Sequence, residues 1–266
     1  MESIRDRFWI FTCVAGADND WLERAGLKTG SRMTPAEGAF YLDVPNLIMV
    51  RWNGIPAYPS DQYAISFRPL KQVVWSIVGS GGENKKNEVE LALDLASRFP
   101  NITGVMMDDF FTEEGKGRVE LDELRTIRNR LNMSRRKLDL WVVLYTHQLY
   151  LPVKPYLELC DVISLWTWNS DDLKNLESNF QQMEQLSDNQ KMLGCYMWDY
   201  PNSKPVSISN MEKQCEMGLQ WLIEGRIQGM IFLANTVCDL DLEVVEWTRR
   251  WIDKVGKISI GEANSD

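Results

Sequence analysis

The chain has 266 residues, 44% of them hydrophobic and 25% charged, and its net charge is -9 from 29 basic and 38 acidic side chains. This is an ordinary globular composition, and the length suits one barrel-sized domain or two smaller ones. The acidic balance argues against a nucleic-acid partner, which requires a basic surface, and suits a neutral or cationic ligand. No segment approaches the roughly 20 apolar residues of a membrane helix, so no membrane partner is expected.

The five cysteines are odd in number and include no C-x-x-C pair. Most lie in apolar surroundings, as at Cys160 and Cys195, which indicates buried free thiols in a reducing compartment. The charged start at Met1 precedes an apolar run of only about eight residues, too short for a signal peptide. We therefore expect a cytoplasmic protein, provided that Met1 is the natural start and no export signal has been trimmed.

Short apolar runs alternate along the chain with segments whose apolar residues recur at the helical spacing of three and four. The apolar runs are continuous, as in parallel strands that are buried on both faces. The strands are expected at about 8–16, 47–52, 72–78, 101–112, 138–146, 161–168, 192–199 and 229–235. Helical segments are expected at 18–25, 60–67, 89–99 and 121–131, after His147, from 170, and at 209–225 and 240–251.

Residues 26–45 are rich in loop-forming types and receive no assignment. Eight strand-and-helix units in a chain of this length predict a single (β/α)8 TIM barrel over residues 1–256, with a C-terminal tail at 257–266. The alternative is an open doubly wound sheet. Its best support would be a glycine-rich phosphate fingerprint after the first strand, and none is present.

The most informative stretch is 101–112, which reads NITGVMMDDFFT. It begins as a buried strand and stops at Asp108 and Asp109, and the carboxyl ends of strands are where α/β barrels place their chemistry. Two poorly solvated neighbouring carboxyls cannot ionise independently. Because side chains alternate along a strand, at most one points into the barrel mouth; we favour Asp108 and keep Asp109 in reserve. Alternatively, one Asp caps the next loop and the other is solvated.

The other strand ends add acidic and aromatic side chains, which would share one surface in a barrel. These are Asp18, Asp20, Arg51, Trp52, Asn53, Ser80, Glu83, Tyr145, His147, Trp166, Trp168, Asn169, Tyr196, Trp198, Asp199, Tyr200 and Asn235. Aromatic faces that stack on sugar rings, together with carboxylates at the scissile bond, are what glycoside chemistry requires. For the tryptophans, the alternative is core packing.

This set predicts an active site with paired carboxylates. Asp108 would be the nucleophile or base, Asp199 the partner acid, and Asp109 a supporting carboxylate. Tyr145 would orient a reacting group. The side chains expected to contact substrate are Trp52, Trp166, Trp168, Tyr196, Trp198, His147 and Asn235.

Several of these residues have structural alternatives. Asp199 precedes Tyr-Pro and could simply form a turn. His147 is the only histidine, and a lone histidine is often a structural residue. A third acid could come from Asp171 or Asp172, although both are also placed to cap the helix that follows.

The segment Gly104–Phe110, with Trp166-Thr-Trp168 and Tyr196-Met-Trp198-Asp199, resembles the TIM-barrel glycoside hydrolase superfamily in the broad sense. The strand pattern behind this resemblance covers nearly the whole chain, and it implies hydrolysis of a carbohydrate. The chitinase-like group has a Glu where this chain has Phe110, and the cellulase-like group has Glu at strands four and seven, where this chain has Asp.

By residue type, the chain agrees better with the α-galactosidase-like group, which uses an Asp nucleophile on strand four and an Asp acid later. It also resembles uncharacterised bacterial barrel proteins with an Asp-Asp-Phe motif, and that resemblance implies no activity.

Other barrel chemistries find less support. A histidine-rich metal site is excluded by the single histidine, whereas a Mg²⁺ or Ca²⁺ site made of Asp108, Asp109 and Asp199 stays open. The loops after strands seven and eight lack the glycines of phosphate-binding barrels. Lys71 and Lys191 stand at strand beginnings, away from the position of a Schiff-base lysine.

We therefore expect no cofactor and no metal. The predicted function is a glycoside hydrolase acting on a carbohydrate or a similar polyhydroxylated ligand. The alternative is a non-catalytic carbohydrate-binding barrel, because no strand ends in the Glu that is commonly the proton donor.

Overall fold

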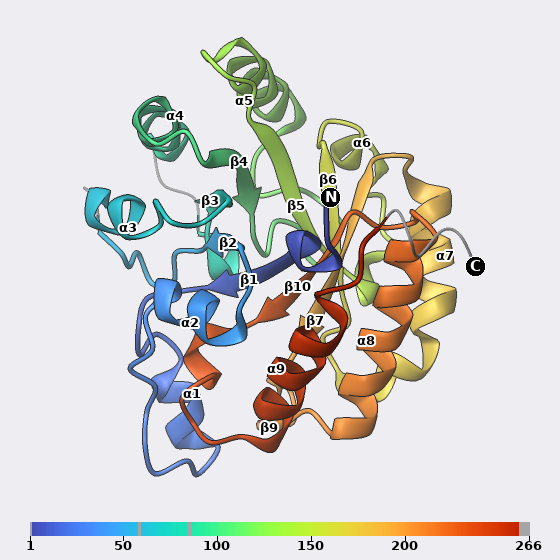
Figure 1. Cartoon of the computed structure of the whole chain (residues 1–266). Coiled ribbons are helices and arrows are strands. Elements are labelled where there is room, and N and C mark those ends of the chain that lie inside the picture. The colour runs from blue at the N-terminus through green and yellow to red at the C-terminus, as the bar shows by residue number, and fades with distance from the viewer. Residues whose placement is uncertain (1, 58–59, 84–86, 261–266) are drawn as a thin grey trace. The chain divides into compact units, whose positions relative to one another are not determined.

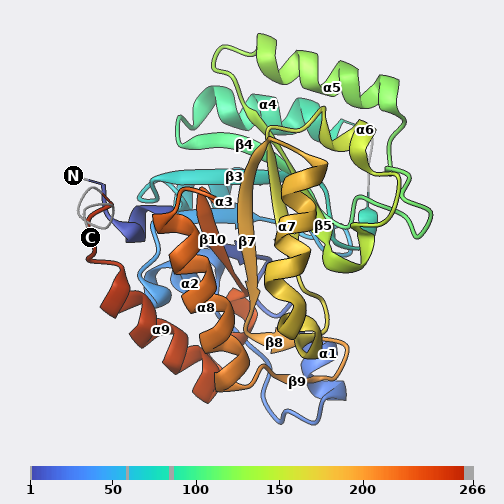
Figure 2. The same cartoon turned by 90° about the vertical axis from the view of Figure 1, so that its right-hand side faces the viewer.

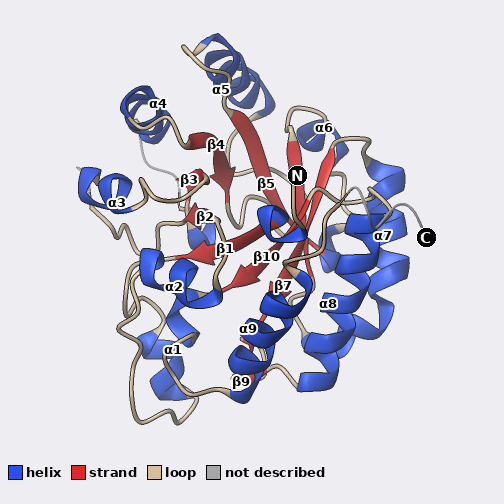
Figure 3. Ribbon diagram, in the orientation of Figure 1, coloured by secondary structure: helices blue, strands red, loops and turns tan. Residues whose placement is uncertain are grey.

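The computed structural model describes residues 2–57, 60–83 and 87–260 (Figure 1). Its parallel strands close a barrel in the order β1-β10-β7-β6-β5-β4-β3-β2, so the predicted (β/α)8 TIM barrel is confirmed. The barrel strands, drawn in red in Figure 3, are β1 (Phe8–Thr12), β2 (Asn46–Met49), β3 (Gln72–Val78), β4 (Ile102–Met107), β5 (Asp139–Tyr145), β6 (Val162–Trp166), β7 (Gln190–Tyr196) and β10 (Gly229–Leu233).

Helical segments separate these strands. The α-helices are α1 (Asn19–Arg24), α2 (Pro35–Leu42), α3 (Asp61–Ser66), α4 (Glu88–Arg98), α5 (Leu121–Met133), α6 (Lys154–Leu157), α7 (Leu176–Leu186), α8 (Ile208–Ile223) and α9 (Glu243–Val255). Short 3-10 helices are η1 (Ile4–Arg7), η2 (Ser80–Gly82), η3 (Thr146–Gln148), η4 (Ser170–Asn175) and η5 (Asn235–Val237). None of the helices in the described ranges is both long and apolar enough to cross a bilayer.

The chain divides into two compact units. Unit 1 comprises the described residues within Met1–Leu47, Trp166–Leu176 and Lys191–Asp266. Unit 2 comprises those within Ile48–Leu165 and Glu177–Gln190.

Unit 2 is built on β3, β4 and β5, which pair in parallel with Trp75 opposite Val105 and Val105 opposite Leu140. Helices α4 and α5 pack beside these strands (Figure 2). Helix α5 buries Leu124 and Leu131 at helical spacing, and each such side chain contributes about 2 kcal/mol by leaving water. The strands approach closely at Gly104, where an added Cβ would lie 2.8 Å from the carbonyl oxygen of Asp139.

Unit 1 is built on β1, β10 and β7, which also pair in parallel. Helices α8 and α9 lie side by side (Figure 1). Helix α9 brings the Trp251 ring to 5.7 Å from Phe8 and 6.4 Å from Phe232, measured between centroids. This explains the apolar stripe of the last predicted helix, because that stripe forms the core contact with β1 and β10.

Helix α2 lies within the segment that was left without assignment. It begins with a capping box, because Thr34 accepts from the Glu37 backbone amide and the Glu37 carboxylate accepts from the Thr34 amide at 2.8 Å. Pro35 occupies the first turn, where its missing N–H costs nothing. The Thr-Pro-x-Glu pattern was thus a readable start signal, although glycines and prolines surround it.

The seventh predicted run also differs from the structure at its end. β7 stops at Tyr196, and Trp198–Asp199 forms a separate short strand, β8, that pairs antiparallel with β9 (Lys204–Pro205). Asp199 therefore belongs to a hairpin and does not close a barrel strand.

Candidate functional site

The predicted site residues form one group in each unit. The group in unit 2, which we call the strand-four cluster, consists of Trp52, Asp108, Asp109, Tyr145 and His147. The group in unit 1, which we call the strand-seven cluster, consists of Trp166, Trp168, Tyr196, Trp198, Asp199 and Asn235.

The two carboxyls of the strand-four cluster follow β4 directly. Asp108 is buried, with 4% of its surface exposed, whereas Asp109 is half-buried. Both carboxyls face the loop that follows β3: Asp108 accepts from the Ser80 hydroxyl at 2.7 Å, and Asp109 accepts from the Gly81 backbone amide at 2.6 Å.

We favoured Asp108 as the acid that points into the barrel mouth and kept Asp109 in reserve; in the structure, Asp109 is the more exposed of the two. β4 ends at Met107, so strand alternation no longer governs the next two residues. Asp109 has a φ of 43°, in the left-handed region that Asp and Asn tolerate better than most side chains. The turn at Asp109 brings both carboxyls to the same loop and leaves Asp109 the more accessible of the two.

The loop Gly79–Gly82, which contains η2, holds the two carboxyls. Gly81 has a φ of 73°, which suits glycine and aims its N–H at Asp109. Gly79 lies so close to the second strand end that an added Cβ would be 2.6 Å from the Arg51 carbonyl oxygen. The Trp52 ring is also near, 3.7 Å from where a Cβ on Gly81 would lie.

Tyr145 closes the cluster from the end of β5. Its hydroxyl donates to Asp109 Oδ1 at 2.7 Å. The exposed His147 ring stacks on the Tyr145 ring, with centroids 5.4 Å apart and planes 8° apart. Partial burial lowers the pKa of His147, which favours the neutral imidazole at pH 7.

The two carboxyls have unequal environments. Burial raises the pKa of Asp108 well above its usual range, and the charge of Asp109 raises it further. The hydrogen bonds from Ser80 and from the Asp109 amide oppose this rise. The pair therefore favours one proton held on Asp108 beside a hydrogen-bonded Asp109, which is how neighbouring carboxyls divide acid and base roles.

The raised pKa of Asp108 predicts a pH-dependent cost to stability. The unfolded chain releases this proton near pH 4 and the folded chain releases it at higher pH, so the stability contributed by Asp108 is full below pH 4 and is lost as pH rises through the folded pKa. We expect Asp108→Asn to gain stability relative to the parent as pH rises from 4 to 7, measured by urea unfolding. The control is Glu113→Gln, which removes an exposed acid nearby. Its free energy of unfolding should change with pH in the same way as that of the parent. If the difference in unfolding free energy between Asp108→Asn and the parent did not change with pH, the raised pKa of Asp108 would be contradicted.

The strand-seven cluster is mostly core. Trp166 and Trp198 are buried, and the Trp166 ring packs edge-on against Phe11 at 5.4 Å and tilted against Tyr196 at 5.0 Å. Trp168 differs from them, because 39% of its surface is exposed. Within this cluster, Trp168 is thus the tryptophan that is partly exposed.

The remaining polar members of the strand-seven cluster hold backbone segments together. Asp199 is buried, and its carboxylate accepts from the Ser170 hydroxyl and from the Asn202 backbone amide at 3.1 Å. These bonds match the turn-forming alternative for Asp199. Asn235 is fully buried and exchanges hydrogen bonds with the Cys13 backbone at 3.1 and 3.0 Å.

Asp171 lies at the start of η4, where its backbone amide donates to the side chain of Asn169 at 3.0 Å. Asn169 is therefore the N-cap, and the helical segment begins at Ser170, where it was expected. No group of three or more His, Cys, Asp or Glu suited to a metal ion occurs in the described part of the chain.

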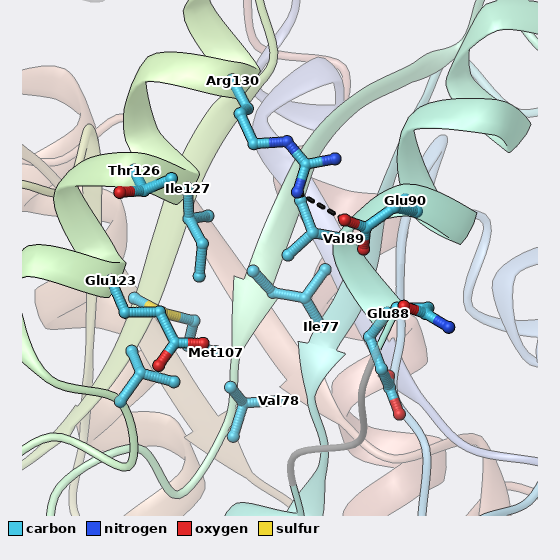
Figure 4. Close-up of a pocket in the computed structure, with 12 residues that line it drawn as sticks. Ile77, Val78, Glu88, Val89, Glu90, Met107, Glu123, Thr126, Ile127 and Arg130 are labelled. Atoms are coloured by element: carbon cyan, nitrogen blue, oxygen red, sulfur yellow. Dashed lines mark hydrogen bonds and ion pairs between the residues drawn. The ribbon is translucent and has the colours of Figure 1, made fainter.

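A cavity of about 370 Å³ lies in unit 2 between α4 and α5, above β3 and β4 (Figure 4). Its floor is apolar, with Ile77, Val78 and Met107, and an ion pair of 2.6 Å between Glu90 and Arg130 spans the two helices. None of the predicted site residues lines this cavity, so it is separate from the strand-four cluster.

No family model and no curated protein sequence matches the chain. Solved structures do match. A candidate α-L-fucosidase from Bacteroides thetaiotaomicron has a TM-score of 0.59 at 10% identity, over 100% of this chain and 98% of that chain. A family 18 chitinase from Crocus vernus has a TM-score of 0.55 at 10% identity, over 92% and 98%. An aldolase from Escherichia coli K12 has a TM-score of 0.52 at 10% identity, over 97% and 94%.

At such low identity, the likeness extends to the fold alone. The resemblance to TIM-barrel glycoside hydrolases is confirmed at that level, while the aldolase illustrates that one barrel supports several chemistries. The chain therefore shares the TIM-barrel fold of these structures.

Proposed function

We propose that the chain is a glycoside hydrolase whose chemistry is carried by Asp108 and Asp109. The observation that supports this best is the unequal pair at the end of β4. Asp108 is buried and bonded to Ser80, and Asp109 is half-buried and bonded to Gly81 and Tyr145. Glycoside hydrolysis needs one carboxyl that holds a proton and one that carries charge.

In this proposal, Asp109 is the carboxylate that meets the substrate. Its negative charge would stabilise the positive charge that develops at the anomeric carbon, or form a bond to that carbon as the glycosidic C–O bond breaks. Tyr145 and the Gly81 amide would hold the carboxylate in position through their hydrogen bonds.

Asp108 would supply the proton that the leaving oxygen takes up. It is bonded to the half-buried Ser80 hydroxyl at 2.7 Å. When Asp108 is protonated, the direction of this hydrogen bond would reverse: Asp108 would donate its proton to Ser80 Oγ while the serine hydroxyl turns and releases its own proton to the leaving oxygen, so that the serine ends unchanged. Water would then complete the hydrolysis and restore the proton on Asp108.

The second candidate is a non-catalytic carbohydrate-binding barrel. It is supported by the exposed Trp168, which could bind a sugar without any chemistry nearby. The buried and hydrogen-bonded Asp199 supports it as well, because the carboxyl first expected to be the partner acid is already engaged in a turn.

A screen of 4-nitrophenyl glycosides separates the two candidates. A hydrolase should release nitrophenolate from at least one glycoside, and the double variant Asp108→Asn/Asp109→Asn should abolish that release. The matched control is Glu113→Gln/Glu114→Gln, which removes two exposed acids from the same loop and should retain activity. Saccharide binding without release by the parent protein would favour the binding barrel.

A further inference from the structure

The cavity between α4 and α5 has the size and the lining of a small-molecule site. Its volume of about 370 Å³ lies in the range of ligand pockets, roughly 300–1,000 Å³. Its floor is formed by the ends of β3 and β4, where Ile77, Val78 and Met107 are buried. Val89 of α4 and Ile127 of α5 add apolar side chains from the two helices (Figure 4). A ligand in the cavity would therefore cover apolar groups from the floor and from both helices.

The charged side chains that line the cavity carry an excess of negative charge. They are Glu88, Glu90, Glu123 and Arg130. Arg130 pairs with Glu90 at 2.6 Å, and Glu88 pairs with Arg51. The Glu123 carboxylate accepts no hydrogen bond and forms no ion pair with any residue in the described part of the chain. The cavity thus offers one negative charge that no described side chain compensates.

Glu123 is placed to meet a ligand in this cavity. Its exposed side chain extends from α5 toward the middle of the cavity (Figure 4). An acid in the first turn of α5 is favoured by the helix dipole, but Asp122 stands in the same turn, pairs with Arg125 and does not line the cavity. The helix dipole therefore does not account for the unpaired carboxylate beside an apolar floor.

We infer that the cavity binds a small organic ammonium ion with an apolar body, such as an aralkylammonium, through Glu123. The ammonium donates a charge-assisted hydrogen bond to the Glu123 carboxylate, and the apolar body covers the floor. An anionic ligand is disfavoured, because Arg130 would have to leave Glu90 to meet it. Binding requires neither Asp108 nor Asp109, so this site is independent of the proposed hydrolysis.

Three probes with the same phenyl and two-carbon body test the charge preference. Phenethylammonium is a cation, phenethyl alcohol is neutral and hydrocinnamate is an anion, and each is titrated into the full chain and followed by NMR. Phenethylammonium should bind saturably and at least about tenfold more tightly than the other two probes, because it alone gains the ionic contact. Equal binding of the three probes would overturn the inference, as would the absence of saturable binding by phenethylammonium.

Two variants place the bound cation. Glu123→Gln keeps the size of the side chain and removes its charge, so it should weaken phenethylammonium binding by about tenfold. Val89→Phe fills part of the cavity and should weaken binding by about tenfold as well. The matched control is Asp122→Asn, which removes a charge from the same helical turn outside the cavity and should change binding less than about twofold.

Unchanged binding in both Glu123→Gln and Val89→Phe would overturn the site, because the cation would then be bound elsewhere. An equal loss in Asp122→Asn would do the same, since it would mean that the negative surface attracts the cation without a specific contact. The double variant Asp108→Asn/Asp109→Asn should bind phenethylammonium within about twofold of the parent whether or not it hydrolyses a glycoside. Loss of binding in that variant would instead place the cation at the strand-four cluster.

Discussion

Asp109→Asn is expected to lower kcat/KM on the best aryl glycoside by about 10³-fold, since a carboxylate acting at the reacting carbon contributes roughly 10²–10⁴-fold. Asn suits this test because it keeps the size of the side chain and tolerates the left-handed φ of 43° at this position. The Asn oxygen can accept from the Gly81 amide and the Asn NH2 can donate to the Tyr145 hydroxyl, so both partners should hold the side chain nearly in place. The expected loss therefore comes from the charge.

The control for this variant is Glu113→Gln, which removes a charge four residues away on the exposed part of the same loop and should change kcat/KM less than about twofold. A second variant, Asp109→Gly, opens space beside the substrate and accepts the same φ. If Asp109 is a nucleophile, added azide should restore turnover in Asp109→Gly and yield a glycosyl azide. Full activity in both variants would remove Asp109 from the mechanism.

The strands of this fold were readable because burial on both faces leaves a continuous apolar run. β3 was predicted at 72–78 and is found at Gln72–Val78. Two predicted strands were too long at their ends. The first continued past Thr12 into residues 13–16, which are apolar in sequence but mostly only partly buried, and the seventh continued past Tyr196 into the buried strand β8 of a hairpin. Apolar character alone cannot distinguish a strand from the turn or hairpin that follows it.

The residue types of the candidate site could be predicted from the sequence, whereas its geometry could be predicted only in part. The pair at 108–109 stood out because two acids close a buried run, but which acid is accessible depends on the φ of Asp109, and sequence does not specify that angle. Ser80 and Gly81 were visible after β3, yet their contact with the pair joins positions 28 residues apart. Such contacts follow from strand order, which becomes known only with the fold.

Trp166 and Trp168 illustrate the same limit within two residues. Both stand at the end of one strand, and aromatic content alone made them equal candidates for sugar contact. The structure buries Trp166 against Phe11 and Tyr196 and leaves Trp168 partly exposed on Tyr200. Strand alternation would point two residues at this spacing the same way, but β6 ends at Trp166, so the loop that follows sets the direction of Trp168.

The other large expected effect concerns a buried ion pair beneath the strand-four cluster. Arg51, just beyond β2, pairs with Glu88, the first residue of α4, and their side chains are only 5% and 3% exposed. The Arg51 carbonyl also accepts from the Ser80 amide at 2.9 Å, which connects the pair to the loop that holds Asp108 and Asp109. Removing one partner takes the opposite charge away from a buried ionised group, so Arg51→Met or Glu88→Gln should each lower the free energy of unfolding by about 3–5 kcal/mol.

The double variant Arg51→Met/Glu88→Met should recover most of that loss in urea unfolding, because apolar side chains of similar size replace both charges. The matched control is an exposed pair that also involves α4: Glu90 on α4 and Arg130 on α5 are 51% and 39% exposed. Arg130→Met should cost less than about 1 kcal/mol, since solvent screens both charges. Equal losses at Arg51 and Arg130 would mean that burial does not set the energy of the Arg51–Glu88 pair. The double variant Arg51→Met/Glu88→Met also separates stability from activity. If it is as stable as the parent but hydrolyses the glycoside slowly, the ion pair contributes to activity by holding the loop that contains Ser80.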